Sequence, residues 1–130
     1  MQTITLGISV KASKTSISIP ERDIEVEATD YLEVEVKPGD LNVDIQPGEA
    51  KALRLLVIKS SVYSDLEFTV NDGANDKSKA VQLDGPQIFS GGAMALFDVQ
   101  QPKRLTFKNK SPDKDKTAKV EIFVGRDATP

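Results

Sequence analysis

A repeated two-residue alternation of apolar and polar side chains is the feature that most constrains the fold of this chain. It is clearest in residues 52–73. Residues 53–58 are almost entirely apolar, and the β-branched Val57 and Ile58 favour a buried strand over a short helix. Residues 66–70 then alternate strictly until the turn sequence Asn71-Asp72-Gly73. We therefore predict two core strands joined by a turn.

The N-terminal third of the chain shows the same alternation. Residues 4–10 predict a strand or a strand-like arm, and residues 17–19 predict a second short strand that Pro20 should end. Residues 23–28 and 32–36 alternate apolar with acidic side chains on either side of a break at Thr29-Asp30. Two acidic-faced strands in succession predict a β-hairpin.

Four further short strands are predicted at residues 41–45, 81–83, 105–107 and 120–124. Pro38-Gly39-Asp40, Pro47-Gly48-Glu49 and Asp84-Gly85-Pro86 are typical turns. The apolar segment 93–99 is ambiguous, and we favour a strand. This pattern predicts an all-β chain: one antiparallel β-sandwich domain over residues 1–130, with residues 1–10 as an extended arm. A jelly roll is the alternative arrangement, because alternation does not specify strand order.

Composition excludes several classes of function. The chain has 130 residues, the size of one domain, and it contains no cysteine and no histidine. It therefore lacks a thiolate nucleophile, a Ser-His-Asp triad and the usual zinc ligands. No apolar run approaches the length of a membrane span and no signal peptide is recognisable, so we expect a soluble protein with no membrane partner.

The charge distribution bears on partners. The net charge of −3 argues against nucleic acid as a partner. Residues 1–50 carry 10 acidic and 4 basic side chains, whereas residues 51–130 carry 10 acidic and 13 basic ones. These are either ordinary solvated faces, or an acidic surface on one subunit that meets a basic surface on its neighbour.

Two groups of polar residues resemble catalytic or metal sites only superficially. Asn71, Asp72, Asn75 and Asp76 offer oxygen ligands, but Gly73 stands third in the segment, where a calcium loop has glycine sixth, so we expect a solvated turn. A row of carboxylates raises the question of a paired-acid glycosidase. Alternation places them on the face opposite the apolar side chains, which predicts a solubilising role: Glu21, Asp23, Glu25, Glu27, Glu33 and Glu35.

A basic cluster near the C-terminus is interpreted either as a solvated loop or as a rim that meets a protein partner. Its members are Lys103, Arg104, Lys108, Lys110, Lys114, Lys116 and Lys119. Phe107, on the apolar side of this segment, is predicted to be core and not a base-stacking platform. A sugar-binding site lacks its usual stacking platforms, since the chain has no tryptophan and only Tyr31 and Tyr63.

The strands and turns after residue 50 follow a recognisable order: an apolar strand, an Asn-Asp turn, a Gly-Pro turn and a terminal Val-x-Ile-x-Val strand. The residues that form this pattern are Leu53 to Ile58, Ser64, Asp65, Leu66, Asn71, Asp72, Gly85, Pro86, Leu105, Phe107, Asn109, Val120, Ile122, Val124, Asp127, Thr129 and Pro130. The pattern resembles that of small β-rich structural proteins of tailed bacteriophages. The resemblance covers about the last 80 residues, roughly 60% of the chain, and residues 1–50 depart from it.

This resemblance implies a virion component with no catalytic, cofactor-binding or metal-binding residues. Among phage β-sandwiches a capsid cement or decoration protein fits best, with the major capsid protein as partner and assembly in the host cytoplasm. We expect a homotrimer at threefold capsid positions, with the arm Met1 to Val10 pairing onto a neighbouring chain or the coat. The alternative is a carbohydrate- or receptor-binding module of a tail or head fibre, and an enzyme is the third hypothesis.

Overall fold

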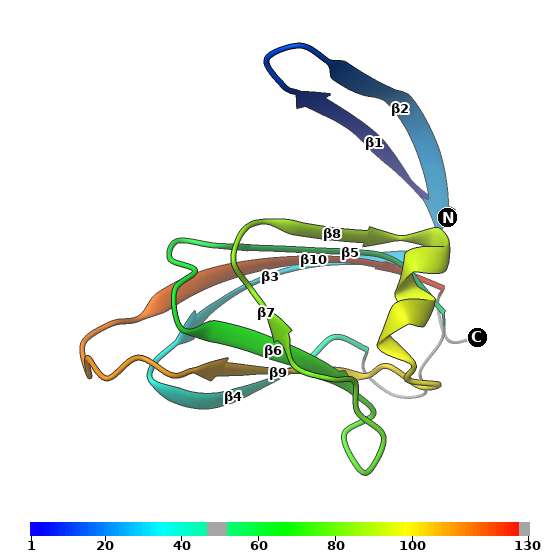
Figure 1. Ribbon diagram of the computed structural model, residues 1–130. Coiled ribbons are helices and arrows are strands. Elements are labelled where there is room, and N and C mark those ends of the chain that lie inside the picture. The colour runs from blue at the N-terminus through cyan, green and yellow to red at the C-terminus, as the bar shows by residue number, and fades with distance from the viewer. Residues whose placement is uncertain (47–51, 128–130) are drawn as a thin grey trace.

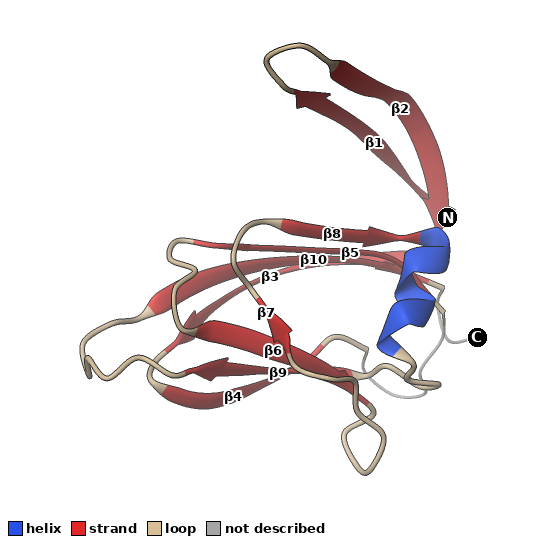
Figure 2. Cartoon of the chain, viewed as in Figure 1, coloured by secondary structure: helices blue, strands red, loops and turns tan. Residues whose placement is uncertain are grey.

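The protein is all-β in a computed structural model that describes residues 1–46 and 52–127 (Figure 1). Within this part of the chain a single helix, the short 3-10 helix η1 (Gly91–Phe97), accompanies ten strands (Figure 2). In chain order the strands are β1 (Gln2–Lys11), β2 (Ser16–Val26), β3 (Ala28–Val36), β4 (Gly39–Asp44), β5 (Leu53–Ser60), β6 (Leu66–Asn71), β7 (Val81–Gln82), β8 (Gln87–Ser90), β9 (Arg104–Asn109) and β10 (Ala118–Arg126).

Eight of the strands form a sandwich of two four-stranded antiparallel sheets, with orders β3-β10-β5-β8 and β4-β9-β6-β7. The pairs are nested: β3 lies beside β10, β4 beside β9, β5 beside β8, and β6 beside β7. Successive strands from β3 to β6 alternate between the two sheets, as do those from β7 to β10. This is the strand order of a jelly roll. The remaining strands, β1 and β2, form a separate hairpin that projects beyond the first sheet (Figure 1).

The core lies between the inward faces of the two sheets. Val120, Ile122 and Val124 of β10 face the second sheet, and Phe68 of β6 and Phe107 of β9 face the first; all are fully buried. The alternate positions of these strands face outward, as their greater exposure shows. The prediction that Phe107 is a core residue is therefore confirmed.

The two core strands predicted in residues 52–73 are confirmed as β5 and β6, but they do not pair with each other. β5 lies in the first sheet and β6 in the second, so the connection between them crosses the edge of the sandwich. Tyr63 in this connection accepts a hydrogen bond from the Ser60 amide through its hydroxyl, at 3.2 Å. The opposite sheet covers one face of each strand. β5 is more apolar than β6 because its outward-facing Leu55 and Val57 are also apolar, and Leu55 is buried.

The predicted hairpin of residues 23–28 and 32–36 is wrong. β2 continues to Val26 and pairs with β1, whereas β3 begins at Ala28 and pairs with β10. Thr29 and Asp30, which suggested a break, lie inside β3 because neighbouring polar groups satisfy them. The Thr29 hydroxyl donates to the Gln2 side chain at 2.6 Å, and Asp30 pairs with Arg126.

Pro20 does not end the second strand, contrary to prediction. Leu6 lies opposite Arg22, and Ile8 lies opposite Ile19, so β2 contains one more residue than β1 between these pairs. The extra residue makes a β-bulge at Pro20, a position where proline is tolerated because ladder hydrogen bonds are interrupted there. The strand therefore continues through the proline with its pairing shifted by one residue.

The predicted strand at residues 93–99 is also wrong, because this segment contains most of η1. The helix begins at Gly91, which has a φ of 56°, and is followed by Asp98 in the left-handed region at φ 54°. Phe97 turns inward from it and is buried. Among the described residues no helix is long and apolar enough to cross a bilayer. The predicted turn at Pro47-Gly48-Glu49 lies outside the described residues.

Replacing Phe68 tests the core. Its ring contacts those of Phe89, Phe97 and Phe107, with centroid separations of 6.1 to 6.4 Å. We expect Phe68→Ala to lower the free energy of unfolding by about 3–5 kcal/mol, through lost burial and the cavity left behind. Urea denaturation measures this loss. Phe123→Ala, on the outward face of β10, is the control and should cost clearly less; equal losses would contradict the assignment of faces.

Candidate functional site

The β1–β2 hairpin carries one predominantly apolar face, on which Arg22 lies opposite Leu6 between the base and the tip. The bulge at Pro20 brings the apolar residues of both parts of β2 to this face, since they have odd numbers before the bulge and even numbers after it. Shifting the pairing by one residue brings both sets to the side occupied by the even-numbered apolar residues of β1. We call this surface the hairpin face; it consists of Ile4, Leu6, Ile8, Val10, Ile17, Ile19, Ile24 and Val26.

The base of the hairpin face packs on the outer surface of the first sheet. A Cβ atom at Gly125 would lie 2.6 Å from Ile4 Cδ1 and 3.3 Å from Val26 Cγ1, so only glycine admits so close an approach without displacement. Leu55, beside Gly125 in the sheet, is buried although it faces outward. The hairpin base therefore serves as a local cover for this end of the sheet.

The tip of the hairpin face is uncovered. Val10, Ile17 and Ile19 are 55%, 61% and 45% exposed. Val10 lies directly opposite Ile17, and Ile8 lies directly opposite Ile19, so these side chains form two adjacent cross-strand apolar pairs. Solvated apolar side chains grouped in this way are typical of a surface that meets a partner.

A second apolar surface lies on the outward face of the first sheet, next to the covered end. Register places one residue from each strand side by side across the whole sheet. We call this set the apolar row; it consists of Tyr31, Phe123, Val57 and Ile88. Tyr31 is 57% and Ile88 45% exposed, and three of the four residues line a shallow depression of ≈ 180 Å³.

Charged residues border the apolar row on the side away from the hairpin base. Glu121 accepts a hydrogen bond from the Tyr31 hydroxyl at 2.6 Å and lies 3.9 Å from the Lys59 ammonium. Glu33 lies opposite Glu121, and Glu35 lies opposite Lys119. The outward face of β3 therefore presents acidic side chains immediately beyond Tyr31.

The outer face of the other sheet carries a polar groove of ≈ 360 Å³ over β4, β6 and β9. At its floor the Asn71 amide donates to the Thr106 hydroxyl at 2.9 Å, and Thr106 donates to Asn42 at 2.8 Å. Lys77 and Lys108 line the groove. Phe68 is the aromatic residue that borders it, and its ring is buried in the core, so it offers no stacking surface.

The predicted basic cluster does not form one surface. Lys108 belongs to β9 in the second sheet, whereas Lys119 belongs to β10 in the first. Three of its members form ion pairs with acidic side chains, with N···O distances of 2.9 Å for Arg104–Asp44, 3.2 Å for Lys110–Glu67 and 3.9 Å for Lys116–Asp65.

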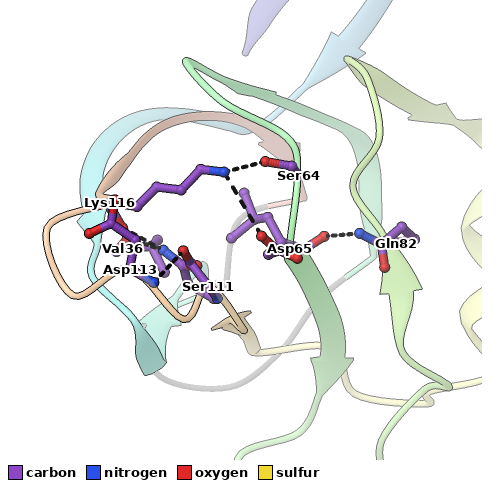
Figure 3. A network of polar contacts seen from close by, with 9 residues as sticks. Val36, Ser64, Asp65, Gln82, Ser111, Asp113 and Lys116 are labelled. Atoms are coloured by element: carbon purple, nitrogen blue, oxygen red, sulfur yellow. Dashed lines mark hydrogen bonds and ion pairs between the residues drawn. The ribbon is translucent and has the colours of Figure 1, made fainter.

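Lys116 and its neighbours hold loops together at one end of the sandwich. The Lys116 ammonium reaches Ser64 and Asp65 in the β5–β6 connection (Figure 3). The buried Asn109 amide donates to the Val36 carbonyl at 3.1 Å and to the Lys116 carbonyl at 3.0 Å. These contacts fasten the loop between β9 and β10 to the end of β3 and to the β5–β6 connection.

The predicted carboxylates do not converge on one site. Glu21, Asp23 and Glu25 lie along β2 in the hairpin, whereas Glu33 and Glu35 lie on β3. In the 71–76 segment the carboxylate of Asp72 is occupied by the amides of Ala74 and Asp76, at 2.8 and 3.2 Å, as in a turn. Within residues 1–46 and 52–127, no cluster of three or more acidic side chains is arranged to hold a metal ion.

No family model matches the chain, and a search of curated proteins gives no match. The candidate site is therefore defined by its surfaces alone. Sequence reasoning identified the apolar residues of β1 but missed the hairpin face, because it treated Pro20 as the end of a strand. The apolar row was missed because its residues come from four strands whose neighbours could not be known without the strand order.

Ionisation of the Tyr31 phenol tests the hydrogen bond between the apolar row and Glu121 on its charged border. Its hydrogen bond to Glu121 is the main reason that its pKa is raised to about 12, and partial burial and the negative charges of Glu121 and Glu33 add to the effect. The folded protein thus favours the neutral phenol. The stabilising contribution is complete below pH 10, the unfolded pKa, and is lost as the pH rises through about 12.

We expect Glu121→Gln to lower the pKa of Tyr31 towards its ordinary value, because it removes the charge on the acceptor. Ultraviolet absorbance of the ionised phenol measures this in a Tyr63→Phe background, where Tyr31 is the remaining tyrosine. Glu33→Gln, which removes the weakest of the four influences, should have a smaller effect. An unchanged pKa in Glu121→Gln would refute the hydrogen bond as its cause.

Proposed function

We propose that this protein is a structural component of a tailed bacteriophage particle, bound outside the capsid as a cement or decoration protein. The observation that carries the proposal is the projecting hairpin with its uncovered apolar tip, a surface suited to binding a neighbouring molecule. The sequence resemblance over residues 51–130 supports the phage assignment. The jelly roll supports it as analogy, because capsid proteins are among the proteins that use this fold.

The mechanism is linkage between binding and stability. Each copy binds the assembled lattice of the major capsid protein and not its separated subunits, so binding free energy is added to the stability of the closed shell. A homotrimer matches the symmetry of a threefold capsid position. The hairpin contributes apolar side chains and also free strand edges, since β1 and β2 pair only with each other among the described strands.

Shortening the hairpin tests this proposal. Replacing residues 8–20 by Asn-Gly joins Gly7 to Glu21 through a two-residue turn and keeps the base contacts of Ile4 and Val26. We expect the shortened protein to remain folded and to bind undecorated capsids of its phage about tenfold or more weakly, which corresponds to a loss of about 1.4 kcal/mol or more of binding free energy. Co-sedimentation with capsids measures occupancy.

The matched control is Ser9→Ala with Ser18→Ala, which alters the opposite, polar face of the same two strands. It should leave occupancy unchanged. Full occupancy by the shortened protein would sink the role of the hairpin in capsid attachment.

The alternative function is carbohydrate or receptor binding by a tail or head fibre. The polar groove over β4, β6 and β9 favours it, because Asn and Thr side chains can bind hydroxyl groups, and lectins also use jelly rolls. The scarcity of exposed aromatic rings in the groove weighs against it. A specific ligand on a glycan array whose binding is lost in Thr106→Val would replace the cement proposal.

A further inference from the structure

The two uncovered apolar surfaces described above, within residues 1–46 and 52–127, would each bind an apolar partner. The tip of the hairpin face presents Val10, Ile17 and Ile19, and the outer sheet presents the apolar row. The base of the hairpin face already packs on the same outer sheet, at Gly125 and Leu55. The covered end of this sheet therefore already binds apolar side chains of the hairpin, next to the uncovered row.

We propose that the tip of the hairpin face of one copy covers the apolar row of a second copy of this chain. The occupant of the row is then the partner's Val10, Ile17 and Ile19, placed on Tyr31, Val57, Ile88 and Phe123. The contact extends the cover that the hairpin base makes over Leu55 in its own chain. Burial of the exposed apolar side chains on both sides provides the driving force.

The hairpin is fixed at its base in a way that disfavours covering its own row. One residue, Glu27, separates β2 from β3, and its amide donates to the Arg126 carbonyl at 3.1 Å. Gln2 is held to Thr29, and Ile4 is packed against Gly125. These contacts set the direction in which the hairpin leaves the sandwich. The hairpin rises at an angle from the first sheet, and its tip stands clear of the sandwich (Figure 1).

Charge also matches the two surfaces. Lys11 and Lys14 lie at the hairpin tip, immediately beyond Val10 and before Ile17, and both lysines are exposed. Glu33 and Glu35 lie immediately beyond Tyr31 on the outward face of β3. Lys59 and Lys119 lie on the neighbouring strands of this border, so its acidic character is concentrated on the edge strand β3. A basic hairpin tip that meets this acidic edge favours one orientation of docking.

The inference deepens the proposed function and rests on it for the idea that the protein acts as an oligomer. The contact is directional, because a hairpin from one copy meets a sheet of another. Repeated around a threefold axis such a contact closes into a trimer, whereas its reciprocal form gives a dimer.

Cross-linking between two different single-cysteine variants tests the contact directly. The natural chain has no cysteine, so each variant carries one defined thiol. Ile17→Cys mixed with Ile88→Cys and treated with a short bismaleimide should give a mixed dimer, which can form only between copies. Ser18→Cys is the control, since Ser18 is also exposed but lies on the opposite face of β2. A yield no higher than that of the Ser18→Cys control would overturn the contact.

Solution mass provides the second measurement. We expect light scattering of the full chain to give a mass of two or three times 14.1 kDa, the mass of one chain. Ile17→Ser with Ile19→Ser should raise the concentration needed for half-association by about tenfold or more, whereas Ser9→Ala with Ser18→Ala should not. High salt should weaken association, because it screens Lys11 and Lys14 from Glu33 and Glu35.

The outcomes separate the contact from the proposed function. A protein that is monomeric at every concentration, or whose mass is unaffected by the isoleucine substitutions, overturns the contact, even if it still decorates capsids through a hairpin that binds the coat. A protein that associates as expected but never binds capsids keeps the contact and loses the cement proposal. A third outcome concerns a double variant that carries both Ile17→Cys and Ile88→Cys. If its two thiols are cross-linked within one chain, and the single variants give no mixed dimer, the hairpin folds onto its own sheet and the contact between copies is overturned.

Discussion

The pairing of β3 with β10 is the interaction on which the remainder of this structure depends. It joins segments far apart in the sequence and forms the outermost of the four nested strand pairs. The other three pairs, β4–β9, β5–β8 and β6–β7, all lie between these two strands in the sequence. Because loop-closure entropy opposes such distant pairing, we expect the fold to form slowly compared with a helical protein of equal length.

The same pairing also positions the interaction surfaces. Gly125 of β10 receives the base of the hairpin, and Phe123, two residues earlier on the same outward face, begins the open part of the sheet beside Tyr31 of β3. The core side of β10 is filled by Val120, Ile122 and Val124. One strand thus contributes alternate residues to stability and to recognition, so the outward face can change without repacking the core.

Alternation was sufficient to predict the fold class and most strand positions, because each sheet has one face in the core. It could not predict pairing. β5 and β6 are adjacent in sequence yet lie in different sheets, and β2 and β3 have similar acidic patterns yet different partners. Local polarity also misled at Thr29 and Asp30, where distant residues supply the hydrogen bonds that a turn would otherwise provide. The apolar row is invisible in the sequence for the same reason.

The bulge at Pro20 limits how the hairpin can change in length. Between Pro20 and the tip, the apolar residues of β2 share a face with those of β1 only because one residue is left out of the pairing. Insertion of one more residue there would turn Ile17 and Ile19 to the polar side while leaving the base in place. Removal of the extra residue would abolish the bulge and leave Ile17 and Ile19 opposite Val10 and Ile8. Related chains that keep both the bulge and this surface should have hairpin strands that differ by even numbers of residues, so that the reach of the hairpin varies in discrete steps of about 7 Å.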